Sequence, residues 1–176
     1  ALKQISYAVR DFDIYRNFLE GVTGVGPTMA AVIISSISIE KAEYPSSIWA
    51  YCGLDVVKGA GRSRKKEHLV ETTYTDADGK EQKKMGISFN PFLKTKLIGV
   101  LGSSFVKTNG KYREIYDNYK HRISNMPAHA EKSKGHLNNM AIRYTVKRFL
   151  VDLYYNWRTM EGLPVADEYS AAKLKM

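Results

Sequence analysis

The stretch GVTGVGPTMAAVII, residues 21–34, constrains the fold more than any other part of the sequence. Gly24 and Gly26 permit positive φ and carry no side chain, so the chain can turn sharply there and approach a neighbour closely. Pro27 suits the first position of a helix, where no amide hydrogen is needed. The apolar run that follows predicts a helix over 28–38, buried on most sides. The sequence therefore predicts helices packed around a tight glycine-rich turn.

This turn matches a helix-hairpin-helix pattern, Leu19-x-x-Val22-x-Gly24-Val25-Gly26-x-x-x-Ala30-x-x-Ile33. In such a motif, backbone amides at the turn and at the following helix N-terminus can bind phosphate oxygens. Gly24, Val25 and Gly26 would supply those amides, and Thr28 could add its hydroxyl. These contacts are largely independent of nucleic-acid sequence. The alternative is a tight turn between two core helices, with no ligand.

Hydrophobic periodicity and turn residues predict the remaining elements. A stripe from Leu2 to Tyr15 predicts a helix over 2–20, and DADG between segments rich in β-branched residues predicts a β-hairpin at about 68–89. A short helix is expected in SSIWAYCG, capped by Ser46 or Ser47 and ended by Gly53. Longer helices are expected over 91–108, 111–124 and 136–160.

Together these elements predict a mainly α fold, in which a helix-hairpin-helix core carries a small β-hairpin insertion. The chain has 176 residues, of which 44% are hydrophobic, enough to bury one core. We therefore expect a single domain over 1–176. Its expected parts are the helix-hairpin-helix at 18–53, a basic loop with the hairpin at 58–89, further helices at 90–160, and an irregular tail at 161–176.

Positive charge is concentrated in the middle of the chain. The formal net charge is +9, and residues 63–148 hold 18 Lys and Arg against 8 Asp and Glu. Such an excess favours a polyanionic partner, most often nucleic acid. The expected phosphate contacts are Arg62, Arg64, Lys65 and Lys66 in the loop 58–67 and Lys94 on the next helix, with Lys83, Lys84 and Lys96 as extensions. The alternative is a solvated loop without a function.

Two further groups of residues have two readings each. Tyr112, Tyr116 and Tyr119 could stack on nucleic-acid bases, but their helical spacing favours packing in the core. Arg143, Lys147 and Arg148 lie on or near one helical face, where they could contact phosphates or only solvate the helix.

Several classes of protein are disfavoured. No apolar run reaches 18 residues, so no membrane helix is expected, and the N-terminus lacks a signal-peptide pattern. The lone Cys52 rules out a disulfide within the chain and fits a reducing compartment, so we expect a cytoplasmic protein. The four histidines lack zinc-ligand spacing, and no acidic cluster or serine triad stands out. We therefore expect no metal and no cofactor, and catalytic residues stay unassigned.

The order of several segments resembles a known family. The segments GVGPTMAAVIISSI, YPSSIWAYCGLDVV, GRSRKK and ISFNPFLKTKLIGV, followed by YREIYDNYKHRI and HLNNMAIRYTVKRFLVDLYYNWR, are similar to the C-terminal helix-hairpin-helix domain of Piv/MooV-type transposases and invertases. That family includes RNA-guided insertion-sequence recombinases, and stand-alone phage-encoded relatives look closer still. The resemblance covers about residues 18–160. It implies a DNA-binding domain of a mobile element.

Two departures from the family bear on activity. The resemblance places the catalytic carboxylates in a separate RuvC-like domain, for which this chain has no room. It also places a catalytic serine just before the basic loop, where Gly59 and Ala60 stand here. Ser63 lies downstream, inside GRSR, and the role is not carried over to it.

Three functions remain open from the sequence. The leading one is a non-catalytic protein that binds DNA, favoured over RNA, in a prokaryotic or phage-infected cell. The second is an active transposase or recombinase subunit, in which Ser63 or a catalytic partner chain supplies the chemistry. The third is a structural or assembly protein that reuses the scaffold. The family resemblance also makes self-association into a homo-oligomer an expectation.

Overall fold

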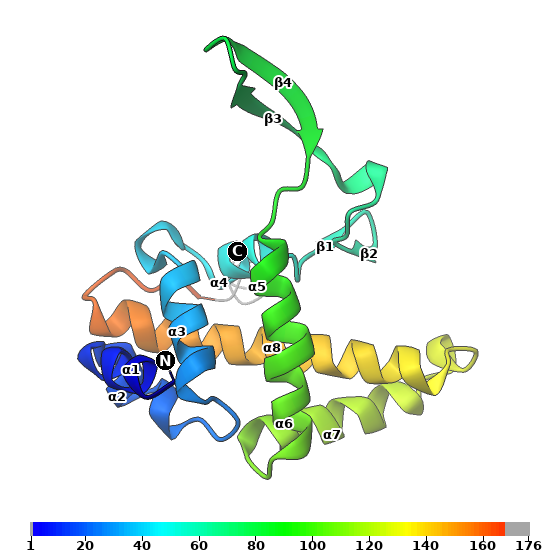
Figure 1. Ribbon diagram of the computed structural model, residues 1–176. Helices are drawn as coiled ribbons and strands as arrows, with labels where there is room; N and C mark the ends of the chain where they lie inside the picture. The colour runs from blue at the N-terminus through cyan, green and yellow to red at the C-terminus, as the bar shows by residue number, and fades with distance from the viewer. Residues whose placement is uncertain (1, 168–176) are drawn as a thin grey trace.

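The computed structural model describes residues 2–167, which form helices around one core and two small antiparallel sheets (Figure 1). The mainly α fold with a small β-hairpin insertion is confirmed. The helical elements are α1 (Leu2–Ala8), η1 (Val9–Asp11), α2 (Asp13–Asn17), η2 (Leu19–Gly21), α3 (Pro27–Ser36), η3 (Ile39–Lys41), α4 (Pro45–Tyr51), η4 (Lys66–His68), α5 (Pro91–Thr95), η5 (Lys96–Gly102), α6 (Ser103–Lys107), α7 (Lys111–Ser124), η6 (Pro127–His129) and α8 (Lys134–Met160). The strands are β1 (Val56–Val57), β2 (Ala60–Gly61), β3 (Val70–Thr75) and β4 (Glu81–Gly86).

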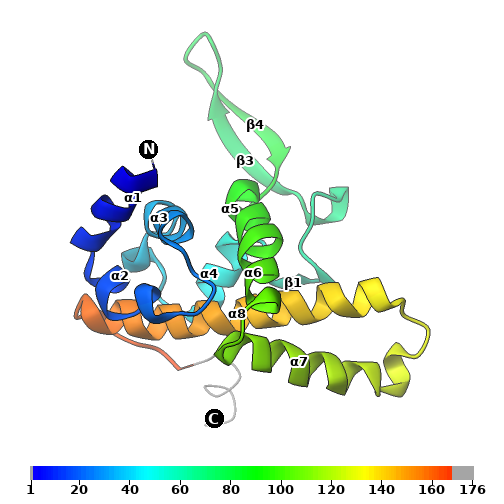
Figure 2. The same ribbon diagram turned by 60° about the horizontal axis from the view of Figure 1, so that its bottom comes forward.

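Helix α8 is the long helix at the centre of the molecule (Figure 1). Its 27 residues span about 40 Å, and α7 lies antiparallel along its first half (Figure 2). The helical rod α5–η5–α6 crosses it, as Figures 1 and 2 both show. The second half of α8 packs with the N-terminal helices and with α4. The helix predicted over 136–160 is therefore confirmed, and it begins two residues earlier.

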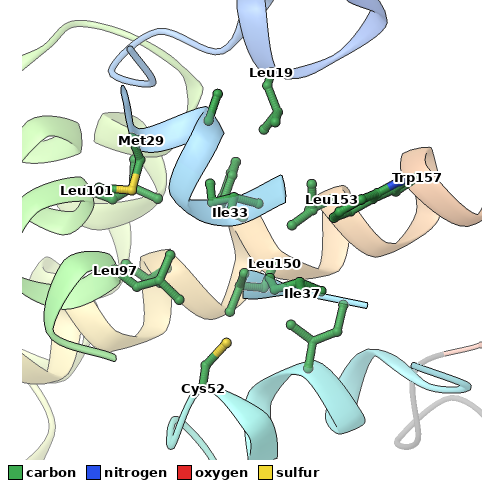
Figure 3. Close-up of a cluster of buried hydrophobic side chains, with 14 of the residues drawn as sticks. Leu19, Met29, Ile33, Ile37, Cys52, Leu97, Leu101, Leu150, Leu153 and Trp157 are labelled. Carbon is green, nitrogen blue, oxygen red and sulfur yellow. The ribbon is translucent and has the colours of Figure 1, made fainter. Parts of the chain in front are cut away.

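The core lies where α3, η5, α4 and α8 meet (Figure 3). Ile33 of α3, Leu97 of η5 and Leu150 of α8 are fully buried there. Cys52 points into the same cluster, and burial raises the pKa of its thiol to about 12. A thiol held neutral in an apolar environment behaves as a small hydrophobic side chain. Helix α3 thus contributes Met29, Ala30 and Ile33 to the core. Its other residues are half-buried or exposed, so the predicted burial on most sides is only partly confirmed.

The helix predicted over 2–20 is wrong as a continuous element. The chain breaks at Phe12, whose backbone is extended with φ −95° and ψ 127°. Along the predicted stripe, Val9 and Tyr15 are buried, whereas Leu2 and Phe12 are exposed. One straight helix could not bring both Val9 and Ile14 onto the core. Tertiary packing therefore overrides the local periodicity here.

Helix starts are only partly as predicted. Pro27 occupies the first turn of α3, as expected, but α3 ends at Ser36. Helix α4 begins at Pro45 with Tyr44 at the N-cap and no side-chain cap, so the caps predicted at Ser46 or Ser47 are wrong. The proline takes the first helical position and moves both serines inside the helix. Gly53 does follow the helix, with φ +67°.

The hairpin of β3 and β4 is confirmed in place and extends away from the helices in both views (Figures 1 and 2). Val70 pairs with Gly86 at its base, and Gly79 adopts φ +78° in the turn. The rod 91–107 is also confirmed, with Asn90 as its cap, since the Asn90 side chain accepts from the Leu93 amide at 3.0 Å. Its middle, η5, is π-helical, which the sequence did not predict. None of the helices between residues 2 and 167 could span a membrane. Of the irregular tail predicted over 161–176, residues 161–167 follow α8 without helix or strand, as predicted, and the rest lies outside the described residues.

Candidate nucleic-acid interface

The glycine-rich turn is seated against the end of α6. Gly24 adopts φ +99°, and a Cβ placed there would lie 3.0 Å from the Phe105 ring and 3.1 Å from the Thr108 hydroxyl. The Ser104 hydroxyl donates to the Gly24 carbonyl at 2.7 Å. Gly24 is therefore needed both for its backbone conformation and for close packing.

The predicted phosphate-binding amides are not equally available in this turn. The Val25 amide donates to the Val22 carbonyl at 3.0 Å, so it is used within the turn. Gly26 and Thr28 are exposed, and Gly26 is the N-cap of α3 without a side-chain cap. Phosphate binding at the first turn of α3 stays a prediction, and it would involve Gly26 and Thr28 more directly than Gly24 and Val25.

Arg62 holds the basic loop to the body of the protein. Its Nε and Nη2 donate to the two oxygens of Asp55, each at 2.7 Å, and its Nη1 donates to the Ser88 hydroxyl at 2.6 Å. The hydrogen bond with Asp55 raises the pKa of the Arg62 guanidinium. Arg62 therefore has a structural role, and its phosphate-contacting role stays a prediction with fewer free donors.

Lys94 and Arg143 lie beside this ion pair. Lys94 Nζ donates to the Arg62 carbonyl at 2.6 Å, and Arg143 Nη2 donates to the carbonyls of Gly53 and Asp55 at 3.0 and 3.1 Å. Burial lowers the pKa of Lys94, and the positive charge of Arg143 lowers it further. Burial likewise lowers the pKa of Arg143. Since Arg62 occupies both oxygens of Asp55, this cluster keeps excess positive charge.

Lys94 and Arg143 also line an open groove of about 690 Å³ between α5–η5 and the first half of α8. Gly61 of β2 also lines it, and a Cβ there would lie 3.0 Å from the Arg143 Cζ. Ile98 and Met140 form an apolar part of the lining, and His136 and Asn139 lie on the α8 side. The sequence did not decide whether Arg143 contacts phosphate or only solvates its helix, and the structure places it beside Lys94.

The loop beyond Arg62 is exposed. Arg64, Lys65 and Lys66 all face solvent, close to the groove because Gly61 and Arg62 border it. The glycine-rich turn lies elsewhere, since Gly24 contacts the opposite end of the same helical rod. Phe105 follows Lys94 by eleven positions, which is about 16 Å along a helix. The structure therefore brings the basic loop and Lys94 together, but not the turn.

A contact missed by the sequence reasoning joins Ser63 to His68. The Ser63 amide donates to His68 Nδ1 at 3.0 Å, and Ser63 Oγ lies 3.0 Å from the same nitrogen. The amide can only donate, so Nδ1 is the acceptor here, and the hydroxyl and the amide share its single lone pair. His68 is buried, with its Nε2 3.9 Å from Glu67 Oε1. In the sequence, the only indication of this contact was that the histidine follows the serine by five positions.

The tyrosines and Lys147, which the sequence offered as nucleic-acid contacts, mostly pack against other residues of the protein. Tyr112 and Tyr116 are buried, and Tyr119 stacks on Tyr144 with ring centroids 3.9 Å apart. The ammonium group of Lys147 lies 4.0 Å from the centroid of the Trp49 ring. Across residues 2–167, no three His, Cys, Asp or Glu side chains are grouped to hold a metal ion.

Comparison of the chain with protein-family models, with curated proteins and with solved structures found no match. The interface described above is therefore defined by its geometry and charge alone.

Proposed function

We propose that this protein binds DNA through phosphate contacts that do not depend on base sequence. The observation that carries the proposal is the cation cluster around Asp55, where Lys94 and Arg143 stand beside an acid already bound by Arg62. Exposed Arg64, Lys65 and Lys66 extend this positive surface along the adjoining loop. Phosphate oxygens are the ligands that such a surface attracts.

The anchored part of the cluster and the exposed loop would contribute differently. Hydrogen bonds to backbone carbonyls fix Lys94 and Arg143 before any ligand arrives, so little side-chain freedom is lost on binding. Arg64, Lys65 and Lys66 are exposed, and they would follow the DNA backbone by neutralising successive phosphates. Gly26 and Thr28, which are exposed at the start of α3, would form a separate phosphate contact.

A salt titration of binding tests this proposal. Fluorescence anisotropy with a 20-base-pair duplex would be measured between about 50 and 200 mM salt, where phosphate contacts weaken steeply. Replacing Arg64, Lys65 and Lys66 by Ala should reduce the slope of log K against log salt by up to about 2.7, because each phosphate contact contributes about 0.9. The matched control replaces exposed Lys3, Arg10 and Lys41, which lie far along the chain from the loop.

Equal losses in the two triple variants would show that only net charge matters and would contradict the proposed surface. Wild-type binding that does not change with salt would contradict phosphate recognition altogether. An RNA duplex of the same sequence is run beside the DNA, and tighter binding to the RNA would overturn the choice of DNA.

The Ser63–His68 contact supports a second candidate, a subunit that cleaves DNA strands. His68 Nδ1 would take the Ser63 hydroxyl proton as Ser63 Oγ forms a bond to phosphorus and the bond to the leaving strand oxygen breaks. The proton would then pass to that oxygen. Incubation with labelled DNA and Mg²⁺ should yield a covalent protein–DNA product that Ser63→Ala abolishes. Absence of this product with the wild type would argue for binding without chemistry.

A further inference from the structure

The groove between α5–η5 and α8 combines two chemically different parts. Lys94 and Arg143 line it with cations, Arg143 directly beside Gly61, whereas Ile98 and Met140 line it with apolar surface. Contacts to duplex phosphates need cations but no apolar lining. We propose that this groove holds a single unpaired nucleotide of DNA, with its phosphate on Lys94 and Arg143 and its base against Ile98 and Met140. This inference rests on the proposed DNA binding and names the form of DNA.

The cationic part suits a phosphodiester. Lys94 uses one hydrogen bond on the Arg62 carbonyl, and an ammonium group has three hydrogens to donate. Arg143 uses Nη2 on the carbonyls of Gly53 and Asp55, and its guanidinium has five N–H donors in all. Both groups are thus held in place with donors to spare. The mutual repulsion of these cations would be relieved by one bound phosphate.

The apolar part suits a nucleobase. The groove as a whole, at about 690 Å³, lies within the size range of pockets that hold small molecules and cofactors. A paired base is stacked inside the duplex, so only an unpaired or extruded base could enter a pocket of this kind. His136 and Asn139 on α8 and Thr95 on α5 add polar groups that could hydrogen-bond to the base edge.

Gly99 offers a way to fill the groove without disturbing the core. It lines the groove, and a Cβ added there would meet no atom within 4 Å. Leucine favours helical backbone more than glycine does, so Gly99→Leu should fold. Val100 is the matched control, because it is 51% exposed on the same segment and does not line the groove. Val100→Phe adds four carbon atoms, as Gly99→Leu does.

The test compares three labelled DNA probes by anisotropy at one salt concentration: a paired duplex, the same duplex with one unpaired thymidine, and the same duplex with an abasic residue at that place. Because the base would bury apolar surface against Ile98 and Met140, the wild type should bind the unpaired-thymidine probe about tenfold more tightly than the other two. Gly99→Leu should remove this preference, so that the unpaired-thymidine probe binds no more tightly than the paired duplex does. Val100→Phe should keep the wild-type preference.

Two results would overturn the inference while leaving the proposed function intact. One is equal wild-type affinity for all three probes. The other is a preference that survives Gly99→Leu or is lost equally in Val100→Phe. Failure of the wild type to bind any probe would instead overturn the proposed function and this inference with it.

Discussion

Arg62 donates two parallel hydrogen bonds of 2.7 Å to the Asp55 carboxylate. This ion pair determines which neighbouring cations remain without a full counter-charge. Asp55 also attracts the neighbouring Lys94 and Arg143, but its single negative charge is shared among three cations, so positive charge remains in excess. An ion pair that holds a loop in place thus also creates the surface that we propose for DNA.

Substitutions of Arg62 and of its neighbour Arg64 should have different effects on stability. Arg62→Ala leaves the partly buried Asp55 carboxylate without its bidentate partner and should lower the free energy of unfolding by about 2 kcal/mol. Arg64 is exposed, so Arg64→Ala should change the free energy of unfolding by less than about 0.5 kcal/mol. Urea denaturation measures both. Arg62→Lys should recover little, since an ammonium cannot bind both oxygens in parallel. A fully stable Arg62→Ala protein would contradict the anchoring role.

The two glycines of the turn should also differ. Gly24→Ala combines a positive φ with contacts to Phe105 and Thr108, and it should destabilise the protein by about 2 kcal/mol. Gly26 has φ −91°, and a Cβ there meets no atom within 4 Å, so Gly26→Ala should be nearly neutral. Thermal unfolding would show the difference as a much larger fall in Tm for Gly24→Ala, since Gly26→Ala loses only the N-cap preference of glycine over alanine. Equal shifts would mean that the turn is not seated on α6.

Local chemistry explains which elements could be predicted from the sequence. Pro27, Asn90 and the Asp-Gly turn act within a few residues, so they placed α3, α5 and the hairpin correctly. The break at Phe12 and the π-helical η5 arise from packing against distant segments, and no local signal marks them.

The candidate site was only half predictable for the same reason. Lys94 and the basic loop were selected by charge, and the structure does bring them together. Which cations are anchored depends on contacts across the fold, such as Arg143 with Asp55, 88 residues apart. A charge count cannot show that Arg62 is occupied by Asp55.

Removal of the hairpin should leave the body of the protein intact. The hairpin extends away from the helices, and isolated two-stranded hairpins contribute little independent stability (Figure 1). Replacing residues 71–85 by Asn-Gly keeps Val70 opposite Gly86 across a two-residue turn. We expect the free energy of unfolding to change by less than about 1 kcal/mol, measured by urea denaturation.

The same variant should retain DNA binding. The replaced segment carries three lysines and four acidic residues, so its net charge is slightly negative. Lys83 is paired with Glu71 at 2.9 Å, and Lys84 lies over the Tyr74 ring. The salt slope of DNA binding should therefore stay the same. A marked loss of slope would show that Lys83 and Lys84 contact phosphates after all.

Lys94 should give DNA binding a dependence on alkaline pH. Burial and neighbouring cations lower its pKa from the ordinary 10.5, so it loses its proton at lower pH than an exposed lysine does. In the window between the lowered and the ordinary pKa, the unfolded chain binds more protons than the folded one. Folding stability therefore rises with pH there, by the linkage relation. Phosphate affinity changes in the opposite direction, because the neutral amine no longer attracts phosphate.

The measurement is DNA affinity by anisotropy from about pH 8 to about pH 10, at constant ionic strength. Wild-type affinity should fall across this range, and Lys94→Met should start weaker and fall less. Lys96→Met is the control, because Lys96 lies on the same helical rod and does not line the groove. It should show the wild-type pH profile. If Lys94→Met keeps that profile as well, Lys94 is not the titrating phosphate contact.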